Sequence, residues 1–159
     1  MNEDDIFQRS PFFANLSTRQ LALLKPLFMP CRCEEGDLLF EQGDVADVLY
    51  LVVRGEVIVR YKPEDGPEIV VARVKPGGIV GWSAALGNRH YTSGAICSAD
   101  SELLCVRGAD LRRLCNQYPE TGIVVLERLA DVIAERLHST RNEVIRLLRQ
   151  GLIASVCEP

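Results

Sequence analysis

The sequence lacks the features that mark several large classes of protein. None of its uncharged apolar runs approaches the roughly 20 residues that a helix needs to cross a bilayer. Its 18 basic residues are outnumbered by 22 acidic ones, so the basic excess of a non-specific nucleic-acid binder is missing. The acidic start MNEDD has no basic n-region of a secretory signal. We therefore expect a cytoplasmic protein that contacts neither membrane nor nucleic acid directly.

Residues that carry out catalysis or bind metals are also scarce. The two histidines, His90 and His138, have no familiar metal-ligand spacing to a cysteine. We find no nucleophile–base constellation and no lysine-containing phosphate loop. The six cysteines occur in a chain without a secretory signal, which favours reduced thiols packed as small hydrophobic groups. The sequence predicts neither an enzyme nor a protein with a resident cofactor.

What is present is an ordinary globular composition, with 47% apolar residues in 159, enough for one domain with a sizeable core. The first thirty residues show helical spacing. Ser17 followed by Gln20 forms a capping-box pattern, which indicates the start of a helix. We expect Pro26 to end or kink this helix and Pro30 to close the helical segment.

From Glu34 to Arg107 the apolar residues alternate or form short runs between turn residues. Gly-Asp pairs and the sequence Pro-Glu-Asp-Gly predict the turns, and the runs between them are rich in β-branched residues. The segments that we predict as strands are 38–40, 48–53, 57–61, 69–74, 79–80, 92–97 and 102–107. Many short strands at regular spacing favour a β sandwich or barrel.

The most informative segment runs from Pro76 to Ala95 and reads PGGIVGWSAALGNRHYTSGA. A short strand stops at a glycine, and the backbone N–H groups of the turn that follows can face an anion. The segment resembles the phosphate-binding cassette of the cyclic nucleotide-binding domain family, Gly-x-x-x-Gly-Glu and, after a variable gap, Arg-(Ser/Thr)-Ala. The resemblance extends over roughly residues 10–115 and includes the glycine-rich stretch EEGDLLFEQGDVADVLYLVVRGEVIVRY.

This resemblance implies a mainly β fold with flanking helices. The expected core is a double-stranded β-helix, or jelly-roll-like β-roll, with N-terminal helices and a long C-terminal helix. The implied division is a β-roll domain over 1–118, a dimerisation helix over 119–150 and a tail over 151–159. In bacterial regulators that resemble this chain, a helix-turn-helix follows the long helix, and residues 151–159 are too few to form one.

The cassette keeps the glycines of the family, Gly77 and Gly81, but not its two charges. Trp82 stands where the family has a ribose-binding Glu, and Tyr91 stands where it has a phosphate-binding Arg. An Arg would offer bidentate, charge-assisted contacts to phosphate, and an indole can donate a hydrogen bond but not accept one. The residues that we expect around a ligand are Ile79, Val80, Gly81, Trp82, Ser83, Ala84, Arg89, Tyr91, Thr92 and Ser93. If Thr92 and Ser93 lie on a strand, at most one of them faces the cassette.

The region from Pro119 to Gln150 predicts one long helix, since proline suits a first helical turn and no other proline follows within it. Its apolar residues repeat at alternating spacings of three and four, a seam typical of helix pairing. A helix of about 30 residues is about 45 Å long, more than a small domain covers. We expect a homodimer through Ile123, Leu126, Ala130, Ile133, Leu137 and Val144, although the early half can instead pack on the β-roll.

Three functions fit these patterns. The leading hypothesis is a regulatory ligand-sensing domain whose altered cassette binds cAMP or cGMP weakly or not at all. The second is a true cyclic nucleotide receptor, or a receptor for another small anion, that uses Arg89 and backbone amides. The third is a structural dimerisation or partner-docking module with a filled pocket, and the sequence does not name the output partner of any of them.

Overall fold

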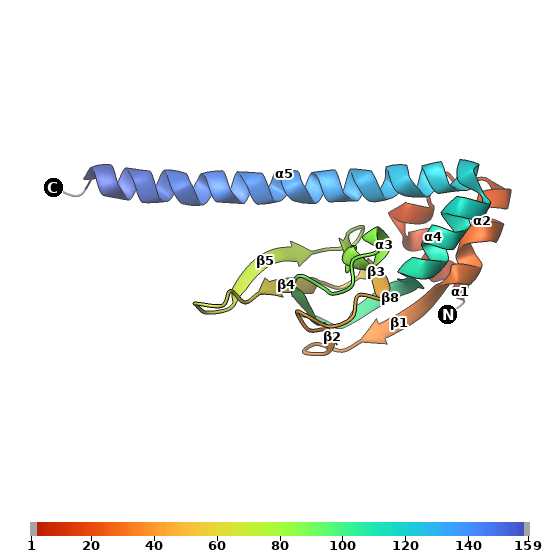
Figure 1. The fold of residues 1–159 in the computed structure, drawn as a ribbon, viewed down its shortest axis with the longest axis horizontal. Coiled ribbons are helices and arrows are strands. Elements are labelled where there is room, and N and C mark those ends of the chain that lie inside the picture. The colour runs from red at the N-terminus through yellow and green to blue at the C-terminus, as the bar shows by residue number, and fades with distance from the viewer. Residues whose placement is uncertain (1–2, 158–159) are drawn as a thin grey trace.

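The computed structural model describes residues 3–157 and contains two antiparallel four-stranded sheets with flanking helices (Figure 1). The strands are β1 (Phe28–Cys33), β2 (Leu38–Phe40), β3 (Val48–Arg54), β4 (Val57–Tyr61), β5 (Ile69–Val74), β6 (Ile79–Val80), β7 (Gly94–Cys97) and β8 (Ser101–Arg107). The helices are α1 (Glu3–Arg9), α2 (Thr18–Leu24), α3 (Ser83–Leu86), α4 (Gly108–Gln117) and α5 (Pro119–Cys157), with 3₁₀ turns η1 (Pro11–Phe13) and η2 (Lys25–Leu27). The predicted β-roll with N-terminal helices and a long C-terminal helix is confirmed.

The two sheets have the strand orders β1-β8-β3-β6 and β2-β7-β4-β5, and β3 in the first sheet is buried on both faces. Leu49 and Leu51 of β3 join a first hydrophobic cluster with the helices, whereas Val52 joins a second cluster with residues of the other sheet. Burial on both faces explains why β3 reads as a continuous apolar run. Cysteines take part as small hydrophobic groups, because free Cys97 is buried in the second cluster and free Cys105 packs against it.

The N-terminal segment is helical as far as Leu27, although one prediction about it is wrong. Ser17 and Gln20 form the predicted capping box, with hydrogen bonds of 2.9 and 3.1 Å between their side chains and backbone amides. Pro26 lies in η2 and ends α2, as expected. Pro30 does not close the helical segment, since it lies inside β1. Among the described strands β1 pairs only with β8, and an edge strand tolerates a residue that cannot donate a hydrogen bond.

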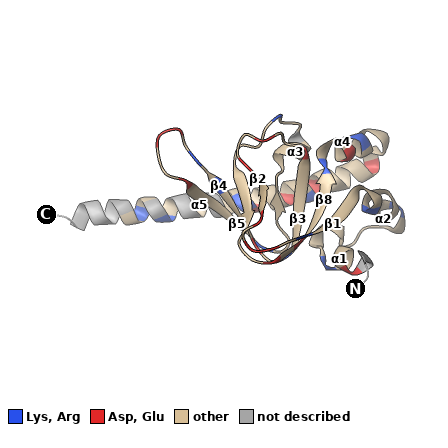
Figure 2. Cartoon of the chain, turned by 90° about the horizontal axis from the view of Figure 1, so that it is seen from below, with Lys and Arg blue, Asp and Glu red and all other residues tan. Residues whose placement is uncertain are grey.

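Helix α5 begins at Pro119, as predicted, and continues past Gln150 to Cys157. Val125 and Leu129 on its early half are buried in the first hydrophobic cluster. The C-terminal end of the helix extends beyond the β-roll (Figure 1). Basic residues occur on α2, α4 and α5, whereas many acidic ones lie in the loops of the roll (Figure 2). No helix in residues 3–157 is long and apolar enough to cross a membrane.

Candidate functional site in the glycine-turned cassette

The cassette segment forms β6, a tight turn at Gly81, the short helix α3 and a loop that leads into β7. Gly81 has a φ of +79°, a left-handed conformation that glycine adopts without strain. A Cβ atom at this position would lie 2.8 Å from the Val48 carbonyl oxygen and 3.3 Å from ring atoms of Phe40 and Tyr91. The turn therefore packs closely against β3 and two aromatic rings, and a residue larger than glycine does not fit at position 81.

A small cavity of about 40 Å³ lies at this turn. Seven of the ten predicted ligand residues line it, namely Val80, Gly81, Trp82, Ser83, Tyr91, Thr92 and Ser93. Of the others, Ile79 lines a different cavity, Ala84 is buried in the second hydrophobic cluster, and Arg89 is exposed and outside the lining. The motif converges on one place, but the space is far below the roughly 300 Å³ of a small ligand pocket.

Tyr91, at the position of the family's arginine, turns its side chain into the core. It is 6% exposed, and its ring stacks on Phe40 with centroids 3.7 Å apart and planes inclined by 15°. The hydroxyl donates to the Val48 carbonyl and accepts from the Val48 N–H at 3.0 Å. Burial raises the pKa of this hydroxyl, so the group stays neutral. Tyr91 therefore fastens the cassette loop to β3.

Trp82 and the two hydroxyl residues complete the wall of the cavity. Trp82 precedes α3, lines the cavity and packs against the first hydrophobic cluster. Because β7 begins only at Gly94, Thr92 and Ser93 lie in the loop before it, and the prediction that they alternate on a strand is wrong. Both line the cavity. The wall thus combines an indole, an aromatic ring and several hydroxyl groups.

The one charged residue in the lining of this cavity is Arg136 of α5, which the sequence reasoning missed. Its Nη1 donates to the Ile79 carbonyl oxygen at 3.4 Å, and burial lowers the pKa of its guanidinium. The spacing from Val125 to Leu129, Val132 and Arg136 is four, three and four residues, the period of one helix face. A charged residue in a row that otherwise faces the core was the feature of the sequence that could have pointed to Arg136. The cassette cavity therefore has a cation, delivered by α5 rather than by the cassette.

Hydrogen bonds to the segment before β3 fix the position of the loop that carries Arg89. The Arg89 carbonyl accepts a 2.9 Å hydrogen bond from the Ala46 N–H, and His90 Nδ1 lies 3.0 Å from the Gly43 carbonyl oxygen. These contacts place the Arg89 side chain at the surface and away from the cassette cavity. Within residues 3–157 no three His, Cys, Asp or Glu side chains are arranged to hold a metal ion.

A two-sheet roll that holds a glycine-turned cassette against a long helix has the architecture of a regulatory, ligand-sensing domain. The chain belongs to the cyclic nucleotide-binding domain family, whose model matches residues 30–118. The match covers β1 to α4, the part of the chain that contains the cassette.

Known relatives agree with this assignment. Over 90% of its length the chain is 30% identical to the cyclic AMP receptor protein of Thermus thermophilus, 72% of which is covered. Over 91% of its length it is 25% identical to the CRP-like cAMP-activated global transcriptional regulator of Mycobacterium tuberculosis, and it spans 63% of that protein. A solved structure, of a candidate cyclic nucleotide-binding protein from Geobacter metallireducens, matches with a TM-score of 0.73 at 28% identity. The match covers 87% of this chain and 100% of the other.

Proposed function

We propose that this chain is a regulatory domain of the cyclic nucleotide-binding fold that binds cAMP and cGMP weakly or not at all. The observation that carries the proposal is Tyr91, which fills the position of the phosphate-binding Arg with a neutral, buried ring. Loss of one charge-assisted phosphate contact from a partly buried site costs about 3 kcal/mol, or roughly a hundredfold in affinity.

The size of the cavity supports the same conclusion. About 40 Å³ is well below the roughly 300 Å³ of a small-ligand pocket, which supports weak or absent binding of a nucleoside. Trp82 and the stacked rings of Phe40 and Tyr91 line this cavity. Arg136 supplies a charge but is itself hydrogen-bonded to Ile79, so binding a phosphate would require it to move.

Calorimetric titration with cAMP and with cGMP tests the proposal. We expect no binding in the micromolar range, and a micromolar or tighter Kd for either nucleotide would contradict the proposal. The receptor hypothesis predicts instead that binding is present and that Arg89→Ala abolishes it. Arg136→Ala is the matched comparison, because Arg136 lines the cavity and Arg89 does not.

The domain division and the dimer stay part of the proposal: a β-roll over 1–118, a dimerisation helix over 119–150, a tail over 151–159 into which α5 continues, and a homodimer formed through α5. Ile123, Leu126 and Leu137 are 57%, 59% and 59% exposed in the single chain, and Ala130 is also exposed. Ile133 packs in part against the first hydrophobic cluster, and the side chain of Val144 lies outside the described residues.

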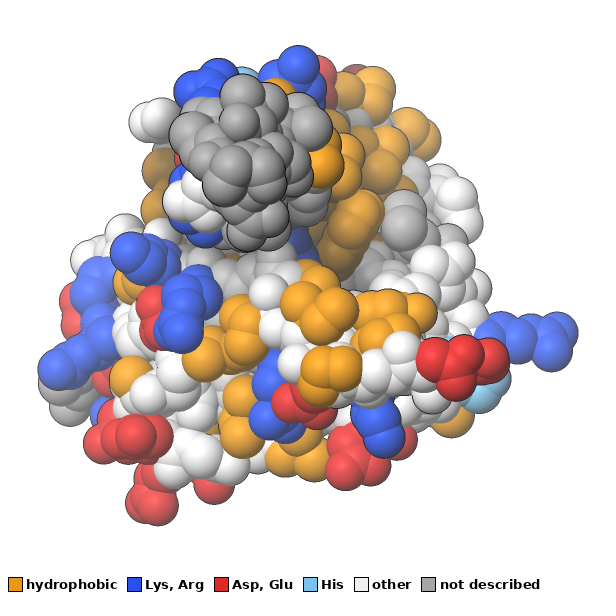
Figure 3. Space-filling model, turned by 90° about the vertical axis from the view of Figure 1, so that its left-hand side faces the viewer, with side chains coloured by type: hydrophobic (Ala, Val, Ile, Leu, Met, Phe, Trp, Pro, Cys, Tyr) orange, Lys and Arg blue, Asp and Glu red, His pale blue; other side chains and the backbone are white. Residues whose placement is uncertain are grey.

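Hydrophobic side chains also gather on the face of the roll beneath the end of α5 (Figure 3). Ile69, Val70 and Val71 of edge strand β5 are 50%, 50% and 41% exposed. Exposed apolar side chains that gather on one part of a surface are typical of an interaction site. The small cassette cavity and this surface together favour, as a second candidate, a docking module whose output depends on partners and not on a nucleotide.

A further inference from the structure

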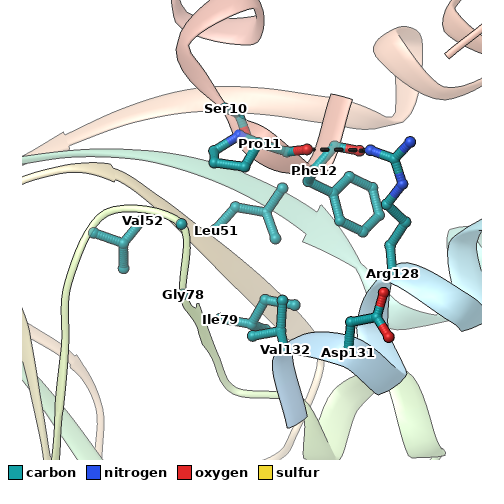
Figure 4. Close-up of a pocket in the computed structure, with 11 residues that line it drawn as sticks. Ser10, Pro11, Phe12, Leu51, Val52, Gly78, Ile79, Arg128, Asp131 and Val132 are labelled. Carbon is teal, nitrogen blue, oxygen red and sulfur yellow. Dashed lines mark hydrogen bonds between the residues drawn. The ribbon is translucent and has the colours of Figure 1, made fainter. Parts of the chain in front are cut away.

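A second, larger cavity lies away from the cassette cavity, where three parts of the molecule meet (Figure 4). Its volume is about 180 Å³. The turn η1 forms one wall, β3 with the Gly77–Gly78 loop and Ile79 forms another, and α5 forms the third. The sequence motifs gave no indication of this cavity, because its walls come from segments far apart in the chain.

The body of the cavity is apolar. Phe12, Leu51, Ile79 and Val132 line it, and the first three are at most 8% exposed. Their side chains surround the same space in Figure 4. Apolar walls of this kind favour an apolar ring or branched hydrocarbon over water.

Polar groups are confined to a few places in the lining. Ser10 is 3% exposed, and its hydroxyl does not cap the helical turn that follows it. On α5, Arg128 Nη1 already donates to the carbonyl oxygens of Pro11 and Phe12, at 3.1 and 2.8 Å. Asp131 lies beside Arg128 (Figure 4) and is exposed, and its carboxylate oxygens are able to accept hydrogen bonds.

These features define a ligand class. Adjacent charges of opposite sign give no preference for a charged ligand, whereas Asp131 and Ser10 can each accept a hydrogen bond. A dry cavity of about 150 Å³ binds benzene in another protein, so this volume accepts one ring with a small substituent. We infer that the cavity between η1, β6 and α5 is a second ligand site, for a neutral molecule of one ring with a hydrogen-bond donor.

An occupant would brace the N-terminal segment, the cassette and the long helix against one another. Ile79 lines this cavity, and the next residue, Val80, lines the cassette cavity. The site does not depend on cyclic nucleotide binding, and it gives the fold a point of control that the altered cassette does not supply.

Phenol is the probe, with benzoate as its charged counterpart, and thermal unfolding of the full chain with ligand-observed NMR is the readout. We expect phenol to raise the unfolding temperature by about 3 °C at roughly ten times its Kd, and benzoate to bind at least about tenfold more weakly. No NMR contact with phenol at concentrations on the order of 10 mM would overturn the proposal. Equal or tighter binding of benzoate would overturn the ligand class.

Two variants locate the binding. Val132→Phe fills the cavity and should abolish the phenol signal, whereas Ala134→Phe adds the same ring to an exposed position of α5 and should leave it unchanged. Ser10→Ala keeps the volume, and it should reduce phenol binding while leaving benzene binding as it was. Phenol binding that survives both Val132→Phe and Ser10→Ala would place the ligand elsewhere and refute the site.

Discussion

At position 91 a phenol ring stands where the family has a guanidinium. The neutral phenol is satisfied by backbone groups of the protein, whereas a guanidinium carries a charge that needs a partner. The Tyr91 hydroxyl pairs with both backbone groups of Val48, and its ring covers Phe40. An arginine at this place would need an anion to compensate its buried charge. The tyrosine needs none, so the cassette keeps its shape with no ligand bound.

Tyr91→Phe tests this role. The variant keeps the ring but leaves the partly buried Val48 N–H and C=O without their side-chain partner, so we expect a loss of about 1–3 kcal/mol in the free energy of unfolding. Tyr61→Phe is the control, because Tyr61 is 41% exposed and its change should stay within about 0.5 kcal/mol. Urea unfolding of the two variants gives the comparison, and equal stabilities would contradict the proposed role of the hydroxyl.

Most of the residues that the sequence predicts around a ligand line one cavity, because they lie in one contiguous segment with a glycine turn. It could not place Arg136, which is more than forty residues from Tyr91 and reaches the cavity only because α5 packs over β6. Arg89 illustrates the converse. It is adjacent to the motif in sequence, but the backbone contacts of its loop leave the side chain at the surface.

Among the elements, α5 is the one that connects the others. Arg128 on its early half donates two hydrogen bonds to backbone carbonyls of η1. Arg136, eight residues further along the helix, donates one to the Ile79 carbonyl of β6. The first of these contacts spans more than one hundred residues of sequence, so no local pattern predicts it.

Local patterns did predict α2, where a capping box specifies the start, and they failed at Pro30, where the position of β1 at the sheet edge permits a proline.

Arg128→Met should loosen the N-terminal segment. Methionine keeps the apolar stem but removes the donors to Pro11 and Phe12, and hydrogen bonds of charged groups contribute about 1.5–3 kcal/mol. Hydrogen exchange should therefore become faster at the amides of Phe13 and Ala14, which close η1. Arg141→Met, at an exposed position of the same helix, should leave those amides unchanged. Unaltered exchange in Arg128→Met would show that η1 does not depend on α5.

For the whole molecule, the two sides of α5 have different roles. One row, including Val125 and Leu129, is buried in the first hydrophobic cluster and fixes the helix to the roll. Another row, including Leu126 and Leu137, stays exposed although it is apolar. The sequence predicted a single pairing seam, and it did not separate the two rows, because both repeat at helical spacing. Only packing shows which row the roll buries and which row stays exposed.

Leu126→Asp should therefore separate a dimer without unfolding the chain. Leu126 is 59% exposed, so the substitution should change monomer stability by about 0.5 kcal/mol or less, while a carboxylate in an apolar seam opposes pairing. Light scattering should give the native protein twice the 17.7 kDa chain mass and the variant a single chain mass at the same concentration. Ala134→Asp places the same charge at an exposed position outside the predicted seam and should remain dimeric. A monomeric native protein at high concentration, or a Leu126→Asp variant that still dimerises, would rule out pairing through this row.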